Sequence, residues 1–231
     1  MISSINEGSF KLTMIIIVCF GLLLRVLTGL GPYSGTDSVF SENFFPQGYN
    51  NPPDFGDYEA QRHWLELTFN TPMDEWYTCS PVNNLSYWRL DYPPLTAYHS
   101  LFLGHLSHIY ENKSVEILTS HGYETPSHKF FMRATVLFSD LIIFISAVLA
   151  FIYYSISKWN NNMKSFMALL LLWCPGFILI DHGHFQYNCC MLGRIIFMIE
   201  LIFFDRTGSL GNCIRALKSY FLLLRLLRFG D

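Results

Sequence analysis

The chain has few charged residues, no paired-cysteine motif and no basic patch. Charged residues make up 14% of the 231 residues, whereas a soluble domain usually carries about 25%. None of the six cysteines lies in a Cys-x-x-Cys pair, which argues against a zinc site and against a disulfide framework. The net charge is −3 and no cluster of Lys and Arg is present, so nothing indicates a nucleic-acid partner.

Apolar residues, by contrast, make up 51% of the chain, and they are clustered. Residues 12–30 form a run with one charge, Arg25, and residues 134–156 form a run with one charge, Asp140. A helix needs about 20 apolar residues to cross a bilayer, so both runs are long enough. The first run is longer than the apolar region of a signal peptide. We therefore expect a retained span there, with a cleaved signal peptide as the alternative.

Two further apolar runs are shorter, at residues 166–180 and 189–204. We expect them to form two short or broken spans on either side of a polar segment, residues 181–188. Because these four runs are interpreted as helical spans, the chain is expected to be an all-α polytopic membrane protein. Residues 1–231 would form a single membrane domain.

The distribution of charge predicts an orientation for these spans. Residues 31–133 hold 12 of the 18 acidic residues but only 5 of the 15 basic ones, whereas the connections at 157–166 and 205–218 are basic. The positive-inside rule places basic connections in the cytosol. Residues 31–133 and 181–188 are then predicted to be lumenal.

The apolar stretch at residues 95–110 is the exception to this simple count of spans. If it crossed the membrane, every later segment would be inverted and the basic connections would face the lumen. We therefore expect an interfacial helix. Two Asn-x-Ser sequons flank it, at Asn84 and Asn112, and both can be glycosylated only in the lumen.

The first motif that can carry chemistry is the stretch GDYEAQRHW, residues 56–64. Residues 57–69 are expected to form a helix with Asp57 in its first turn, where a carboxylate is favoured. A positioned carboxylate can act as a general base, with an effect on the order of 100- to 10,000-fold in rate. The alternative is that Asp57 only caps the helix, and that Glu59 and Arg62 form a surface pair.

The second motif contains Asp91 and Tyr92, followed by Pro93 and Pro94 at the start of a predicted helix. Aromatic residues here are either interfacial anchors or stacking surfaces for sugar rings. Taken alone, the motif leaves both readings open.

The third motif is DHGHFQYN, residues 181–188. One Asp and two His residues invite a metal interpretation. However, His182 and His184 are two residues apart, which suits neither a helical pair nor a strong zinc spacing. We expect no metal here, and interpret the motif as polar substrate contact or helix capping.

In this order, the stretches GDYEAQRHW, LDYPPLTAYH and DHGHFQYN resemble the dolichyl-phosphate-glucose alpha-1,3-glucosyltransferases of the endoplasmic reticulum, and among them the group that adds the first glucose to the lipid-linked oligosaccharide. The resemblance implies a GT-C fold whose first lumenal loop holds the catalytic acid. It also implies an inverting transfer with no metal or other cofactor. Dolichyl phosphate glucose would be the donor and a mannose-rich dolichol-linked oligosaccharide the acceptor, both presented at the lipid bilayer of the endoplasmic reticulum.

The resemblance also assigns roles to residues. Asp57 would be the catalytic base. The residues expected to line or support the substrate site are Glu59, Arg62, His63, Trp64, Asp91, Tyr92, Asp181, His182, His184, Gln186 and Tyr187.

The resemblance is expected to run from about Gly35 to about Asn188. The following residues are expected to depart from the family pattern, with residues 205–231 as a divergent tail, so that the fold would be truncated. An alternative function is therefore a catalytically incompetent fragment of such an enzyme. A transporter is a third class, suggested by Arg25 and Asp140 within the apolar runs.

Overall fold

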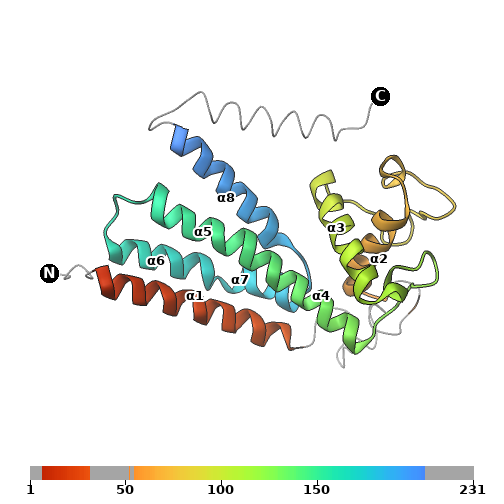
Figure 1. Ribbon diagram of the computed structural model, residues 1–231, viewed down its shortest axis with the longest axis horizontal. Helices are drawn as coiled ribbons and strands as arrows, with labels where there is room; N and C mark the ends of the chain where they lie inside the picture. The colour runs from red at the N-terminus through yellow and green to blue at the C-terminus, as the bar shows by residue number, and fades with distance from the viewer. Residues whose placement is uncertain (1–6, 32–51, 53–54, 206–231) are drawn as a thin grey trace. The chain divides into compact units, whose positions relative to one another are not determined.

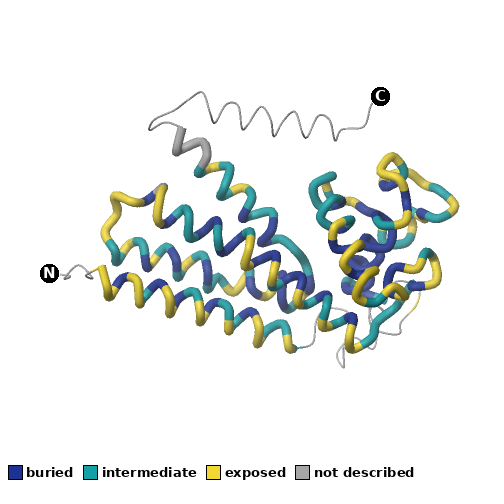
Figure 2. The backbone as a smooth tube through the Cα atoms, in the orientation of Figure 1, coloured by how far each residue is buried: buried dark blue, intermediate teal, exposed yellow. Residues whose placement is uncertain are grey.

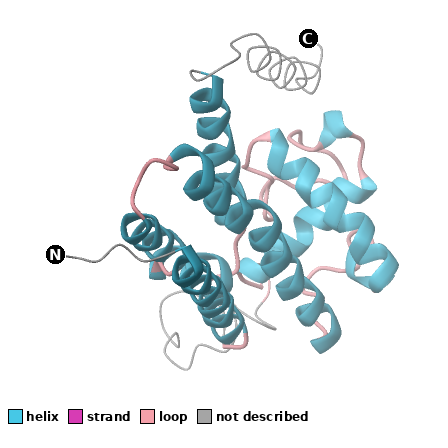
Figure 3. Ribbon diagram, turned by 60° about the vertical axis from the view of Figure 1, so that its left-hand side comes forward, coloured by secondary structure: helices cyan, strands magenta, loops and turns pink. Residues whose placement is uncertain are grey.

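The computed structural model describes residues 7–31, 52 and 55–205, and all regular structure in these residues is helical (Figures 1 and 3). The chain forms two compact units. One, here called the loop unit, consists of residues 32–135, and the other, the bundle unit, consists of residues 1–31 and 136–231. These boundaries lie within two residues of those predicted for the acidic segment, 31–133.

The bundle unit is built from long apolar helices. The first is α1 (Glu7–Gly29). The second is the end of α4 (Pro126–Ser139), which continues through η3 (Asp140–Ile145), α5 (Ser146–Ala150) and η4 (Phe151–Ser155). The elements that follow are α6 (Asn161–Leu172), α7 (Pro175–Ile178), η5 (Leu179–Gly183) and α8 (Asn188–Asp205). Among the described residues, three helices are long and apolar enough to cross a membrane: Glu7–Gly29, Pro126–Tyr154 and Asn161–Gly183. The chain is therefore a helical membrane protein.

The second predicted span begins earlier than its apolar run. The run starts at residue 134, but the helix starts at Pro126, where proline is well suited to the first helical turn. Lys129 and Arg133 interrupt the hydrophobicity without interrupting the helix. The length of an apolar run reports only apolar residues, so it does not include the polar first turns of α4.

The third predicted span is also longer than expected. The run at 166–180 lies inside a helical segment of 23 residues, Asn161–Gly183. Asn160 caps its start by accepting a hydrogen bond from the backbone N–H of Met163 at 2.9 Å. The helix is therefore longer than the apolar run, and residues 181–183 of the predicted polar segment continue it as η5. Which of these residues cross the bilayer stays a prediction.

The fourth predicted span matches α8, whose bounds differ by one residue at each end from the predicted 189–204. Two ionisable residues of the run, Arg194 and Glu200, lie in this helix. It is not among the three candidate spans found in the described part of the chain.

The bundle packs one face of α1 against its other helices. Phe10, Met14 and Ile17, spaced four and three residues apart, are buried in one apolar core with Phe144 of η3 and Leu172 of α6. This spacing places them on one helix face. The opposite face of α1 is also apolar and exposed (Figure 2). A helix that is hydrophobic all round is typical of a membrane span.

A buried polar cluster lies inside this apolar bundle. The guanidinium of Arg25 pairs with the Asp140 carboxylate and donates to the backbone oxygens of Gly21 at 3.0 Å and Leu172 at 2.7 Å. His182 Nε2 lies 3.1 Å from the same Asp140 oxygen. Arg25 and Asp140 are fully buried, so each supplies the partner that the other requires in an apolar environment.

The loop unit is organised around two packed helices. It contains α2 (Asp57–Asn70), η1 (Met73–Glu75), α3 (Pro94–Tyr110), η2 (Asn112–Val115) and the first turns of α4. The helix predicted at residues 57–69 is confirmed with one further residue. The stretch 95–110 is helical and packs against α2. Gly104 permits the close approach, because a Cβ there would lie 2.7 Å from the backbone oxygen of Leu65.

A chain of hydrogen bonds joins four side chains of the loop unit, from α2, α3, η2 and α4. His128 lies 2.6 Å from the Tyr58 hydroxyl through Nδ1 and 2.9 Å from the Ser107 hydroxyl through Nε2. Ser107 in turn lies 2.7 Å from the Ser114 hydroxyl. Because all four side chains are buried, their mutual hydrogen bonds offset the cost of removing them from water.

The contact of α8 with η3 yields a testable prediction. A Cβ at Gly193 would lie 2.8 Å from the backbone oxygen of Ile143. We expect Gly193→Ala to lower the free energy of unfolding by about 1–3 kcal/mol, because the helices must separate. The matched control is Gly29→Ala, where a Cβ would meet nothing within 4 Å. Thermal unfolding of the protein in detergent measures both, and equal melting temperatures for the two variants would contradict the packing.

Candidate functional site

The candidate base, Asp57, stands at the first position of α2, just after a sharp corner. Phe55 has φ 57° and Gly56 has φ 88°, and the backbone oxygen of Gly56 accepts the first helical hydrogen bond from Ala60 at 3.3 Å. The residue at the capping position is therefore Gly56, which offers no capping side chain. Asp57 is half-buried. The prediction that Asp57 lies in the first turn is confirmed, and the residue at the capping position itself is Gly56.

One turn further along α2, Arg62 is fully buried in an ion cluster. It forms a two-point ion pair with Glu59, at 2.6 Å from Nε and 2.5 Å from Nη2, and Nη2 also donates to Glu66 at 2.7 Å. Its Nη1 donates to the backbone oxygen of Ser114 at 2.7 Å and to the hydroxyl of Ser120 at 2.6 Å. The alternative of a surface pair between Glu59 and Arg62 is therefore wrong.

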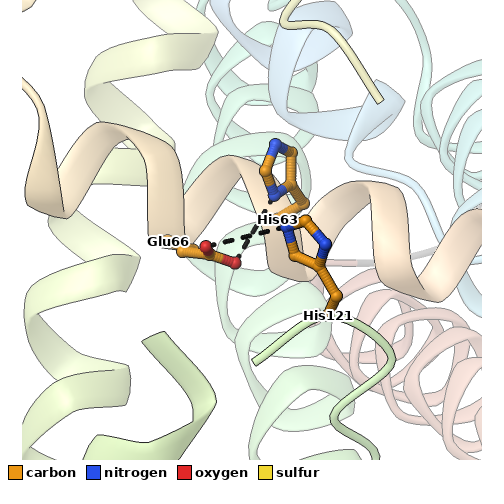
Figure 4. Close-up of side chains that lie close together, drawn as sticks. All are labelled: His63, Glu66 and His121. Atoms are coloured by element: carbon orange, nitrogen blue, oxygen red, sulfur yellow. Dashed lines mark hydrogen bonds and ion pairs between the residues drawn. The ribbon is translucent and has the colours of Figure 1, made fainter. Parts of the chain in front are cut away.

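Three aromatic rings cover this ion cluster. The Tyr87 hydroxyl donates to Glu59 at 2.7 Å, and its ring stacks on His121 with centroids 4.2 Å apart. His63 meets the edge of the Tyr87 ring at 4.9 Å. Both imidazoles face Glu66: His63 Nδ1 lies 3.4 Å and His121 Nε2 lies 3.9 Å from its carboxylate oxygens (Figure 4).

His63, Glu66 and His121 form the one group in the described residues with the composition and spacing of a metal site. However, Glu66 already accepts hydrogen bonds from Arg62, from the backbone N–H of Leu118 at 2.7 Å and from Ser120 at 2.9 Å. A divalent cation on this carboxylate would stand close to the Arg62 guanidinium, and like charges repel. The residues present fit a hydrogen-bonded ion cluster better than a metal centre.

The charges within the cluster shift the pKa values of its members. Burial alone would raise the pKa of Glu66, but hydrogen bonding with His63 and the charge of Arg62 lower it to about 2. Burial alone would likewise lower the pKa of Arg62, but Glu59 and Glu66 raise it. Burial lowers the pKa of His121. Glu66 and Arg62 are therefore both charged at neutral pH, as their ion pair requires.

The second motif is brought next to α2 through Trp64. The Trp64 indole N–H donates to the backbone oxygen of Trp88 at 2.8 Å, and its ring lies against Tyr92 with centroids 5.2 Å apart. Trp64 is buried, Tyr92 is half-buried and Asp91 is exposed. The structure thus assembles the first two motifs in the loop unit.

The third motif lies in the bundle unit, and its residues divide into two sets. Asp181 is buried and accepts hydrogen bonds from the backbone N–H groups of Asn188 at 2.8 Å and Cys189 at 2.6 Å, so it caps the start of α8. The capping alternative is confirmed for this residue. His182 is also buried, in the cluster with Asp140.

The other residues of the third motif are more accessible. His184 is exposed, and Gln186 and Tyr187 are half-buried. They follow η5 in the turn that leads into α8, where Phe185 adopts φ 72°.

Several partners of these motifs were not predicted from the sequence. Four side chains contact residues of α2 that are 24 or more residues away in the chain: Tyr87, Ser114, Ser120 and His121. None of them lies in a recognisable motif, and spacing along the chain carries no signal of such long-range contacts.

Comparisons with known proteins agree with this architecture. The chain matches the model of the ALG6, ALG8 glycosyltransferase family over residues 15–217, and it belongs to that family. It is 45% identical over 203 residues to the dolichyl pyrophosphate Man9GlcNAc2 alpha-1,3-glucosyltransferase of Mus musculus, and 42% identical over 203 residues to the protein of the same name from Gallus gallus. Each alignment covers 87% of this chain and 37% of the relative.

The chain therefore spans somewhat more than a third of the length of the curated relatives that it matches. The family match begins at residue 15 and continues to residue 217. The predicted departure from the family pattern after Asn188 was consequently wrong. The apolar, basic composition beyond that point had suggested a break, but those features are common to many membrane helices and their ends.

The ion cluster yields a second testable prediction. Arg62→Met would leave Glu59 and Glu66 buried without their cation, and we expect a loss of about 3–5 kcal/mol of unfolding free energy. The matched control is Arg89→Met, since Arg89 is exposed in the same unit and surface changes usually stay within about 0.5 kcal/mol. Chemical denaturation in detergent measures both. A variant as stable as the Arg89 control would show that the cluster does not stabilise the fold.

Proposed function

We propose that the chain carries the catalytic loop of an enzyme that transfers glucose from dolichyl phosphate glucose to a mannose-rich dolichol-linked oligosaccharide in the endoplasmic reticulum membrane. One observation carries the assignment of the base. Of the three carboxylates on α2, Glu59 and Glu66 are buried and paired with Arg62, whereas Asp57 is only half-buried. Asp57 is thus the carboxylate of this helix that a substrate can reach.

The proposed reaction needs a single proton acceptor. A hydroxyl of the acceptor sugar attacks the anomeric carbon of the donor glucose, and Asp57 takes the proton from that hydroxyl. The bond between the anomeric carbon and the phosphate oxygen breaks, and dolichyl phosphate leaves with the electron pair. Attack opposite the leaving group inverts the anomeric carbon. Because a phosphate is already a good leaving group, neither a general acid nor a metal is required.

The remaining motif residues then fall into two roles. In the loop unit, Asp91 and Tyr92 are exposed or half-buried, and we propose that they contact the sugars or the phosphate. In the bundle unit, taken by itself, His184, Gln186 and Tyr187 are exposed or half-buried, and we propose that they are substrate contacts of that unit. The buried motif residues are proposed to support the accessible ones within their own unit: Glu59, Arg62, His63 and Trp64 in the loop unit, and Asp181 and His182 in the bundle unit.

Substitution of the base tests the catalytic proposal. We expect Asp57→Asn to lower glucosyl transfer by about 100- to 10,000-fold, since the amide cannot accept the proton. The matched control is Asp74→Asn, because Asp74 is an exposed acid of η1 in the same unit. Transfer of labelled glucose from dolichyl phosphate glucose is measured in microsomes that lack the endogenous enzyme. Unchanged turnover in the Asp57 variant would exclude this residue as the base.

The assay is run with the chain itself and with a chimera, in which residues 15–217 replace the matched segment of the mouse relative. The short coverage of the relatives motivates the second arm. Transfer by the chimera but not by the chain would favour the alternative of a catalytically incompetent fragment. Transfer by neither would count against the proposed function.

The proposed orientation places the loop unit in the lumen. It rests on the excess of acidic residues in residues 31–133 and on the basic connections at 157–166 and 205–218. Asn84 and Asn112 are both exposed in the loop unit, so their sequons are accessible to a lumenal transferase.

Glycosylation tests this orientation directly. We expect a decrease in apparent mass after glycosidase treatment of the microsomal protein, and no decrease in the Asn84→Gln, Asn112→Gln double variant. A sequon built near the end of the chain by Arg228→Asn with Gly230→Ser is expected to stay unmodified, because that segment is predicted to be cytosolic. Modification of this added sequon in the double variant would reverse the orientation.

A further inference from the structure

The chain enters α2 through a backbone conformation that one of its residues does not favour. Phe55 has φ 57° and Gly56 has φ 88°. Glycine adopts positive φ at little cost, but a bulky residue such as Phe does so rarely. Such strain persists only where the surrounding structure compensates for it. The contacts of the Phe55 side chain therefore stabilise the backbone conformation at residues 55 and 56.

The Phe55 ring lies against Gly122, which is 67 residues further along the chain. A Cβ added to Gly122 would lie 2.6, 2.7 and 2.9 Å from three atoms of that ring. Gly122 itself has φ 73°. Two independent features, the contact and the backbone angle, thus require glycine at this position.

The same segment also contacts α2 further along the helix. The backbone N–H of Leu118 and the hydroxyl of Ser120 donate to Glu66, at 2.7 and 2.9 Å. Glu66 lies nine residues after Asp57, about 14 Å along the helix axis. Residues 118–122 therefore hold α2 at two separated points, one at Glu66 and one at the corner before Asp57. Two such contacts constrain the direction of the helix as well as its position.

We infer that Gly122 is a positioning residue for glucosyl transfer, because it seats the Phe55 ring and thereby fixes the corner that carries Asp57. This inference rests on the proposed role of Asp57 as the base. Gly122 does not touch the reacting atoms. A side chain at this position would displace the Phe55 ring, and with it the first turn of α2. A displacement of about 1 Å in a catalytic group can cost about 100-fold in rate.

The test compares two Gly→Ala variants that disturb α2 at different places. In the full chain and in the mouse chimera, Gly122→Ala is expected to lower kcat by about 10- to 100-fold, with KM for dolichyl phosphate glucose changed less than about threefold. Loss of kcat at constant KM is the signature of an interaction that acts only in the transition state. Phe55→Ala is expected to lower kcat similarly. The double variant should be no worse than either single one, because both changes remove the same contact.

Gly104→Ala is the matched control. Its added Cβ would lie 2.7 Å from the backbone oxygen of Leu65, so it also disturbs α2, but eight residues beyond Asp57. We expect it to lower the melting temperature while kcat, measured per folded protein, stays unchanged. An equal loss of kcat in the Gly104 and Gly122 variants would reduce Gly122 to a general stabilising role and overturn the inference.

The outcome is separable from that of the proposed function. If Asp57→Asn is inactive while Gly122→Ala keeps the wild-type kcat, the inference is wrong and the assignment of the base stands. If Asp57→Asn retains full turnover, the assignment of the base is wrong, and the inference about Gly122 is wrong with it.

Discussion

The loop unit depends on the requirement that a buried guanidinium find an acceptor for each of its donors. Arg62 is fully buried and makes five hydrogen bonds, three to carboxylates on its own helix and two to residues 114 and 120. An unpaired charge in this position would cost several kcal/mol. The partners on α2 follow from helical spacing, but the two others must be delivered by a chain that returns after α3. The position of residues 112–122 is therefore set by the needs of one side chain on α2.

A buried ion pair also lies in the bundle unit, where the surroundings are more apolar. Arg25 and Asp140 interrupt the two longest apolar runs, and each is the other's partner. The transporter alternative is not required to account for this pair, because each side chain neutralises a charge that would otherwise face hydrocarbon. His182 joins the pair through Asp140. The cluster thereby links α1, η3 and η5, which come from three separate parts of the sequence.

Sequence reasoning succeeded where the signal is local and failed where it is not. In the described part of the bundle unit, apolar runs located the four long helical segments, and the helix beginning at Asp57 followed from its first-turn signals. Run length missed the polar turns at Pro126 and after residue 180, because helices continue through polar residues that find partners. The burial of Glu59 and Arg62 was missed for a related reason. The residues that bury them, such as Tyr87 and Ser120, are distant in sequence and belong to no motif.

These contacts also change what the family motif means physically. In GDYEAQRHW, residues 58–64 are all buried, and Asp57 is the half-buried residue next to them. Most residues of the motif therefore have a proposed supporting role, and one residue, Asp57, supplies the proposed chemistry. Loss of one member of such a cluster would leave the other charges buried without their partner, which is strongly destabilising. The motif says less about the substrate, which must be recognised by accessible residues elsewhere. The position of Asp57 then depends on residues outside the motif. Among the described ones is Gly122, where a side chain would collide with the Phe55 ring.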